Sequence, residues 1–186
     1  MEQVTRCAWC NTKNPLYVAY HDREWGVLRL DDQYLLEMLI LESFQAGLSW
    51  ECVLNKRENF RKAYCDFDLD TVCAFDQDDQ ERLAADAGII RNKRKIKASV
   101  DNARIFRGIA NEFGSFAKYL QSFTHGKIFY ETHCTTSPLS DAISHDLQKR
   151  GVKFVGSVII YSYLQAIGII NSHEPTCFLY KKEQTE

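Results

Sequence analysis

The segment from Tyr34 to Phe44 constrains the fold more than any other part of this chain. Its apolar residues are so dense that, on a helix, they would cover nearly every face. Asp31 or Asp32 precedes it as a candidate N-cap, and Gly47 follows it as a stop signal. A helix that is apolar all round is stable only when other elements enclose it. The segment therefore predicts a central, buried helix.

The rest of the chain predicts further helices around this one. We find no strand-like alternation of useful length, no internal repeat and no low-complexity segment. The predicted fold class is therefore all-α, a compact helical domain over residues 1–186, with residues 1–30 and 124–138 irregular. The polar set at residues 56–59 is expected to face water. The other expected helices span residues 50–64, 69–75, 76–86, 92–113, 116–123, 140–150 and 157–169.

Composition excludes several classes of protein. No apolar run is long enough to span a bilayer, and no hydrophobic region follows the first residues as in a signal peptide. The seven cysteines, an odd number, fit a reducing compartment better than a disulfide framework. We therefore expect a cytoplasmic protein without membrane contact. We also expect a monomer, since no heptad or exposed apolar stripe is evident.

A local basic cluster follows a glycine-containing turn between two predicted helices. The net charge of −2 gives no global sign of nucleic-acid binding, so the evidence must be local. The turn contains Gly88 and Ile90, and five cations follow within seven positions. A hairpin whose second helix starts at the surface offers backbone N–H groups and positive charge to a DNA phosphate. A solvated basic face on an ordinary helix pair explains the same pattern equally well. The cations are Arg91, Lys93, Arg94, Lys95 and Lys97.

Cysteine and histidine residues gather near both ends of the chain. His173 and Cys177 have the spacing of a zinc half-site, and Cys7 and His21 offer a second pair. Two Cys and two His form a closed, structural type of site, which would tie residues 1–30 to residues 171–186. Cys10 is an alternative ligand because Cys7 and Cys10 also have zinc-pair spacing, and scattered residues without a metal are a further possibility.

The central apolar helix carries two carboxylates, Glu37 and Glu42. They lie five positions apart, about 140° around a helix, so they do not share a face. Gln45 lies one turn beyond Glu42 and does share its face. Burying a carboxylate without a partner is costly, so at least one of them needs either a functional reason or a cationic partner. The residues alone leave both explanations open.

Taken together, these features resemble one known family. The chain is similar to the 3-methyladenine DNA glycosylase I family, within the helix-hairpin-helix DNA glycosylases, over nearly its whole length from Cys7 to Cys177. Several of the matching segments are long and chemically unusual. They are residues 15–22, 24–26, 41–42 with 45–50, 87–91 and 149–156.

The resemblance implies roles for particular residues. It implies one structural zinc per chain, held by Cys7, His21, His173 and Cys177. The lesion pocket falls on Glu42, Tyr17, Tyr20 and Trp50, with Trp9 as a further aromatic and Gln45 beside Glu42. Leu48 corresponds to the residue that wedges into the base stack, and the hairpin residues Gly88, Ile90, Arg91, Lys93 and Lys95 are expected to contact DNA.

The resemblance also implies a reaction on alkylated double-stranded DNA. An adenine methylated on N3 is cationic, so aromatic faces and Glu42 would select it over neutral adenine. The methylated base is an activated leaving group, so positioning and electrostatics suffice for its hydrolytic removal. No carboxylate lies in residues 107–110, about twenty positions after the turn, and no lysine matches an amine nucleophile. The expected enzyme is monofunctional and leaves an abasic site.

Two other functions remain compatible with the residues. One is a non-catalytic, zinc-containing module that binds damaged DNA, which would not need Glu42 together with its aromatic neighbours. The other is a zinc-stapled helical adaptor for proteins, which would show no steep loss of DNA affinity with salt.

Overall fold

The computed structural model describes residues 4–181, and it is mostly helical as predicted. A single two-stranded ribbon among the described residues is the departure from an all-α fold. In chain order the elements are α1 Pro15–Arg23, α2 Asp32–Gln45, α3 Trp50–Leu54, α4 Arg57–Ala63, the 3-10 helix η1 Cys65–Phe67, α5 Leu69–Ala74, α6 Gln77–Ala85, α7 Lys93–Phe113, α8 Phe116–Thr124, β1 Phe129–Tyr130, α9 Pro138–Lys149, α10 Ser157–Ala166 and β2 Ile170–Asn171.

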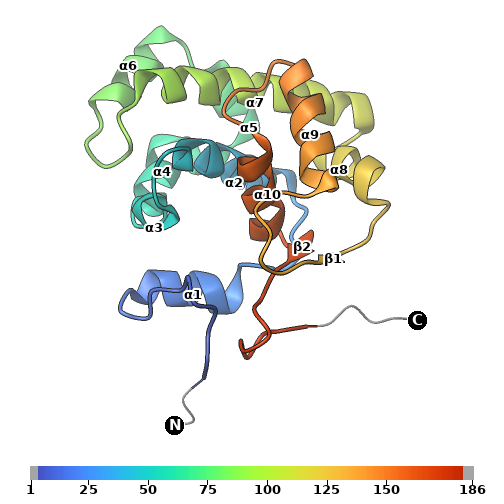
Figure 1. Ribbon diagram of the computed structural model, residues 1–186. Helices are drawn as coiled ribbons and strands as arrows, with labels where there is room; N and C mark the ends of the chain where they lie inside the picture. Colours follow the sequence, from blue (N-terminus) through green and yellow to red (C-terminus); the bar gives the residue numbers. More distant parts are fainter. Residues whose placement is uncertain (1–3, 182–186) are drawn as a thin grey trace.

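Helix α2 lies at the centre of the molecule, as its sequence predicted (Figure 1). Every residue from Tyr34 to Phe44 is buried, and the helix contacts α3, α7, α8 and α10. The Asp31 side chain accepts the Tyr34 N–H at 2.9 Å and caps the first turn. Burying each large apolar side chain contributes about 1.5–3 kcal/mol, so this helix contributes substantially to core stability.

Helix α1 was missed by the sequence prediction, which left residues 1–30 irregular. Asn14 caps it, its side chain accepting the Leu16 N–H at 3.1 Å, and Pro15 occupies the first helical position. Both are recognisable start signals. The helix is short and mixes aromatic and polar residues without a clear apolar stripe, so its pattern is weak.

The predicted helix over residues 50–64 is two helices, α3 and α4, separated at Asn55 and Lys56. The expectation that residues 56–59 face water is wrong for Arg57, which is buried. Its guanidinium reaches Glu37 at 2.8 Å and Glu24 at 2.7 Å. A buried cation needs such partners, because removing it from water otherwise costs several kcal/mol.

The C-terminal part of the chain folds back against the N-terminal part. The Gly26 N–H donates to the Gln165 carbonyl at 3.0 Å, and the Arg29 N–H donates to the Ile167 carbonyl at 3.0 Å. Strands β1 and β2 pair in parallel, with Phe129 opposite Ile170 and Tyr130 opposite Asn171. These contacts bring residues 5–30 and 170–178 to one side of the helical core (Figure 1). No helix in residues 4–181 has the length and apolar character needed to cross a membrane.

Candidate active site and metal centre

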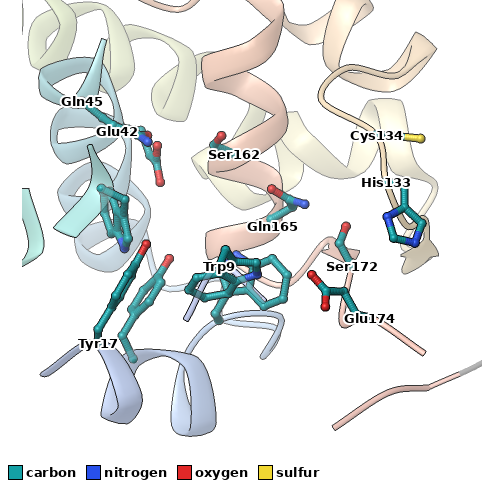
Figure 2. A pocket seen from close by; sticks show the side chains of 13 residues that line it. Trp9, Tyr17, Glu42, Gln45, His133, Cys134, Ser162, Gln165, Ser172 and Glu174 are labelled. Atoms are coloured by element: carbon teal, nitrogen blue, oxygen red, sulfur yellow. The ribbon is translucent and has the colours of Figure 1, made fainter. Parts of the chain in front are cut away.

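A pocket of about 320 Å³ lies between α1, α2, α3 and α10 (Figure 2). Six of the residues predicted for a lesion pocket line it together. They are Trp9, Tyr17, Tyr20, Glu42, Gln45 and Trp50. The sequence placed these residues in one group, and the fold brings them from three helices and the N-terminal loop to one cavity.

Within residues 4–181, Glu42 is a buried carboxylate with no cation beside it. It is 2 % exposed, and its Oε2 atom has no hydrogen-bond partner among the residues that the structure describes. Burial alone raises the pKa of this carboxyl to about 8. Leaving a buried acceptor without a partner costs about 1–3 kcal/mol, so the position favours a ligand that supplies a donor or a positive charge.

Two further polar atoms near Glu42 are also without partners. Gln45 Oε1 and Trp50 Nε1 are buried and make no hydrogen bond within residues 4–181. Buried polar groups are normally satisfied, and a cluster of exceptions marks a place for a bound molecule. Together the three side chains offer acceptors and an N–H donor to one ligand, as the edge of a nucleobase requires.

Glu37, the other carboxylate of α2, forms ion pairs with two arginines. It receives Arg57 Nε at 2.8 Å and Arg61 Nε at 2.7 Å. Burial raises its pKa, but the two guanidinium groups outweigh burial and hold the pKa below its usual value. The structure thus separates the two explanations that the sequence left open. Glu37 is neutralised by cations, and Glu42 is kept free.

Aromatic rings form the walls of the pocket. Tyr17 and Tyr20 lie one turn apart on α1, and Trp50 opens α3 directly after Ser49, whose hydroxyl caps that helix. The Tyr20 and Trp50 rings are 5.3 Å apart at their centroids, and Trp9 lies 5.3 Å from Tyr17. Burial raises the pKa of Tyr17 to about 12, so its hydroxyl stays neutral. Such faces attract a cationic ring system.

Cys7, His21, His173 and Cys177 meet in a second cluster beside the pocket. All four are buried, and their ligand atoms lie within 4.8 Å of one another. The separations between sulfur and nitrogen are 3.5 Å for Cys7 Sγ and His173 Nδ1 and 3.6 Å for Cys177 Sγ and His21 Nε2. Tetrahedral zinc with bonds of about 2.0–2.3 Å requires separations close to these. The donor set therefore fits zinc.

Outer hydrogen bonds orient both imidazoles of this cluster. His21 Nδ1 faces Asp22 Oδ1 at 2.8 Å, and His173 Nε2 faces the Trp25 carbonyl at 3.3 Å. These partners direct the other ring nitrogen of each histidine at the cluster, as in known zinc sites. Cys10 is not part of the cluster, because its sulfur points to the Tyr17 carbonyl at 3.9 Å. Of the two cysteines that the sequence left as alternatives, Cys7 is the one placed to bind.

The turn between α6 and α7 presents part of the predicted DNA-binding set. The Asn92 side chain caps α7, and the Gly88 N–H donates to Asp86 Oδ1 at 2.7 Å. A Cβ atom at Gly88 would meet that same oxygen at 2.9 Å and Asn59 Cγ at 3.1 Å, so a larger residue there would have to displace both side chains. Arg91 and Lys93 are exposed, and Ile90 is half-buried against the core.

Lys95 corrects the sequence prediction. It was expected to contact DNA, but it is only 7 % exposed. Its ammonium donates to the Phe44 carbonyl at 2.8 Å and the Ala46 carbonyl at 2.5 Å. These are free carbonyls at the C-terminus of α2, where a cation is favourable. Lys95 thus fixes the end of the helix that carries Glu42.

Leu48 lies at the tip of the turn that joins α2 and α3. It is 43 % exposed although it is apolar, and the preceding Gly47 has a φ of +80°. That backbone conformation favours glycine and directs the turn outward. The predicted wedge residue is therefore exposed, on the turn between two helices that contribute to the pocket.

The sequence prediction missed about half of the pocket lining. The missed residues are Trp25, His133, Cys134, Ser162, Gln165, Ser172 and Glu174. Most of them come from the C-terminal half of the chain, on α10 and the segments around β1 and β2. Only tertiary contact brings them to the pocket, so no local pattern could have indicated them. Trp25 lay in one of the segments that resemble the family, and Ser172 and Glu174 flank the predicted zinc ligand His173.

Comparison with known proteins gives consistent matches over nearly the whole chain. The family model of methyladenine glycosylase matches residues 9–180. DNA-3-methyladenine glycosylase 1 of Escherichia coli (strain K12) is 45 % identical over 184 residues, covering 95 % of this chain and 97 % of that protein. A crystal structure of 3-methyladenine DNA glycosylase I has a TM-score of 0.91 at 43 % identity and covers 95 % of this chain and 100 % of its own. A variant of such an enzyme in complex with 3-methyladenine has a TM-score of 0.87 at 33 % identity, with 92 % and 95 % covered.

Proposed function

The chain belongs to the methyladenine glycosylase family, and we propose that it excises 3-methyladenine from alkylated DNA. The reaction is hydrolysis of the N-glycosidic bond between the base and its deoxyribose, which leaves an abasic site. The observation that carries the proposal is Glu42, a buried carboxylate without a cationic partner that faces an aromatic pocket. Such a carboxylate suits a cationic base better than any neutral one.

Recognition follows from the protonation state of Glu42. With its pKa near 8, Glu42 is largely protonated at neutral pH while the pocket is empty. A cationic base lowers this pKa, so Glu42 loses its proton and forms an ion pair with the bound base. Normal adenine is neutral and cannot stabilise the carboxylate, which disfavours it. The rings of Tyr20 and Trp50 add the attraction of their faces for a cation.

The proposed path of the base begins with its extrusion from double-stranded DNA. A methylated base pairs poorly, so extruding it costs less than extruding a normal one. Leu48, exposed at its turn, fills the gap that the base leaves. Arg91 and Lys93, on the hairpin formed by α6 and α7, contact the phosphates. The pocket is complete within one chain, which supports action as a monomer.

We infer that the cluster of Cys7, His21, His173 and Cys177 binds one structural zinc ion. The distances and the outer hydrogen bonds of both histidines support this assignment. With four protein ligands the ion would have no open coordination position, so its role would be structural and it would not activate water. It would tie the N-terminal loop that carries Trp9 to the segment after β2. Trp25, which lines the pocket, packs against His173 at 4.7 Å between centroids.

The test is base release from methylated DNA. Purified protein is incubated with alkylated duplex, and the released bases are identified by chromatography for wild type, Glu42→Gln and Trp50→Ala. We expect release of 3-methyladenine that is strongly reduced in both variants. Glu58→Gln, an exposed carboxylate on α4, is the matched control and should keep wild-type activity. Folded, zinc-loaded wild type that binds methylated DNA but releases no base would instead support the non-catalytic damage-binding module.

A further inference from the structure

Leu48 is the last residue of a tight turn between α2 and α3. Residues 45–48 form a type II β-turn, in which Ala46 has φ −47° and ψ 112° and Gly47 has φ +80°. The Leu48 N–H closes the turn by donating to the Gln45 carbonyl at 2.6 Å. In a type II turn the peptide between the two central residues is rotated by about 180° relative to a type I turn. The Ala46 carbonyl belongs to that peptide, so its direction distinguishes the two turns.

Lys95 fixes the direction of this carbonyl. Its buried ammonium donates to the Ala46 carbonyl at 2.5 Å and to the Phe44 carbonyl, in the last turn of α2, at 2.8 Å. Within residues 4–181 it has no carboxylate partner, and burial lowers its pKa. Burying a cation without an anion is costly, so a side chain that only fills space would not need the charge. The position therefore indicates a role for the ammonium in holding the turn.

This contact comes from the helix that is expected to bind DNA. Helix α2 has no basic residue in its own last turn, where a lysine or arginine can bind the free carbonyls. Lys95 lies in the first turn of α7 instead, two positions after the exposed Lys93. Helix α7 packs against α2 (Figure 1). The end of α2 is thus held by the DNA-binding hairpin and not by its own neighbours in sequence.

A second lysine connects the same two parts in the opposite direction. Lys56, between α3 and α4, donates to the Ala87 carbonyl at 3.3 Å and to the Gly88 carbonyl at 3.2 Å, both in the turn of the hairpin. The segment that carries Leu48 is therefore joined to the hairpin before α3 and after it. A hairpin held on the DNA backbone would hold this segment at a fixed place as well.

We propose that Lys95 is a positioning residue for Leu48, connecting the turn that carries this wedge to the helix that binds the DNA backbone. The inference rests on the proposed function and extends it, because extrusion of the base needs a wedge at a defined place. When Arg91 and Lys93 bind phosphates, Lys95 sets the direction in which Leu48 enters the base stack. Without the ammonium, the Ala46 peptide loses the hydrogen bond that fixes its direction, and Leu48 fills the gap poorly.

The first test is a double-mutant cycle on base release. Single-turnover release of 3-methyladenine from methylated duplex DNA is measured for wild type, Lys95→Met, Leu48→Ala and the double variant. Methionine keeps the length of the side chain and removes the ammonium. Misplacing a group by about 1 Å can cost about 10²-fold in rate, so we expect Lys95→Met to lose about 10–10²-fold. The double variant should lose no more than the larger single loss, because Lys95 acts through Leu48.

The second test separates the wedge from the pocket. In methylated single-stranded DNA no partner strand holds the base, so its extrusion costs least. Lys95→Met should therefore match wild type in release from single strands and in affinity for free 3-methyladenine, measured by tryptophan fluorescence. That titration also counts the folded protein, so a low yield of folded variant does not alter the comparison. Lys95→Gln, which keeps a neutral N–H donor on a shorter side chain, should lose less on duplex DNA and serves if Lys95→Met does not fold.

The matched control is Lys118→Met. This lysine is exposed on α8, beyond the end of α7 that is far from the hairpin (Figure 1). It should keep wild-type rates on duplex and on single strands.

The third test follows insertion of the wedge without the chemistry. A duplex with a tetrahydrofuran abasic analogue carries 2-aminopurine opposite the analogue, and its fluorescence rises when the stack is disturbed. Wild type should raise the signal, whereas saturating Lys95→Met and Leu48→Ala should raise it less.

Several results would overturn the inference. These are a wild-type duplex rate in Lys95→Met, equal losses on duplex and single strands, and losses that multiply in the double variant. A wild-type duplex rate in Leu48→Ala would also overturn it, because Lys95 would then have no wedge to position. Wild type that raises the 2-aminopurine signal but releases no base would refute the proposed excision alone, whereas active wild type with an unaffected Lys95→Met refutes only the role of Lys95.

Discussion

Replacing Glu42 by glutamine should stabilise the folded protein at alkaline pH while impairing its function. Glutamine keeps the shape of the side chain and removes the buried charge. In the wild type, burial raises the pKa of Glu42 from 4.5 to about 8. Each pH unit between the unfolded and folded values changes the free energy of unfolding by about 1.4 kcal/mol. Ionising Glu42 in the empty pocket therefore costs the folded state roughly 5 kcal/mol.

The sign of the pH dependence follows from where the proton is held. Because the folded pKa exceeds the unfolded one, the folded state keeps a proton between pH 4.5 and about 8 that the unfolded chain has lost. The free energy of unfolding therefore decreases as pH rises through this window. In Glu42→Gln this contribution is absent. The difference between the two proteins should change by several kcal/mol from pH 5 to pH 8, in favour of the variant.

Urea denaturation at several pH values measures this difference, and the subtraction removes other groups that titrate in both proteins. Glu37→Gln is the matched control on the same helix. It breaks the ion pairs with Arg57 and Arg61, so it should destabilise the protein by about 3–5 kcal/mol at neutral pH. Parallel pH profiles for wild type and Glu42→Gln would refute the reasoning, since they would mean that Glu42 is not desolvated in the empty pocket.

Three further predictions concern the aromatic walls of the pocket, the zinc site and the DNA contacts. Trp50→Ala should weaken binding of free 3-methyladenine by about 2–10-fold, because stacking on an aromatic ring contributes about 0.5–1.5 kcal/mol to binding of this neutral base, and fluorescence titration or calorimetry measures this. Cys177→Ser should lose bound zinc by elemental analysis and lower the melting temperature, and a chelator should lower that of wild type but leave the variant unchanged. Lys93→Ala should reduce the salt dependence of DNA affinity by about one counterion, whereas Lys95→Ala should lower stability and leave the salt slope unchanged.

Local patterns in the sequence were sufficient to predict most of the helices and part of the site. The apolar run of α2 and the helix expected over residues 92–113 are short-range signals that the structure confirms, and of the two candidate caps for α2 the structure selects Asp31. Helix α1 was not predicted because it is short and has no clear apolar stripe, although Asn14 and Pro15 mark its start. The mixture of Trp9, Tyr17, Tyr20, Glu42, Gln45 and Trp50 was recognisable because these residues stand in unusual segments close to one another in the chain.

The residue types that the site needs can be read from the sequence: two carboxylates on a buried helix, aromatic residues before and after it, and two Cys and two His at the ends. The charge states and partners of these residues depend on tertiary contacts. Tertiary contacts pair Arg57 with Glu37 and leave Glu42 without a cationic partner among the described residues. They also bury Lys95, which was expected at the surface, against the C-terminal carbonyls of α2. The physical reason is that burial and partner choice depend on contacts between distant segments, and these set both pKa values and unsatisfied hydrogen bonds.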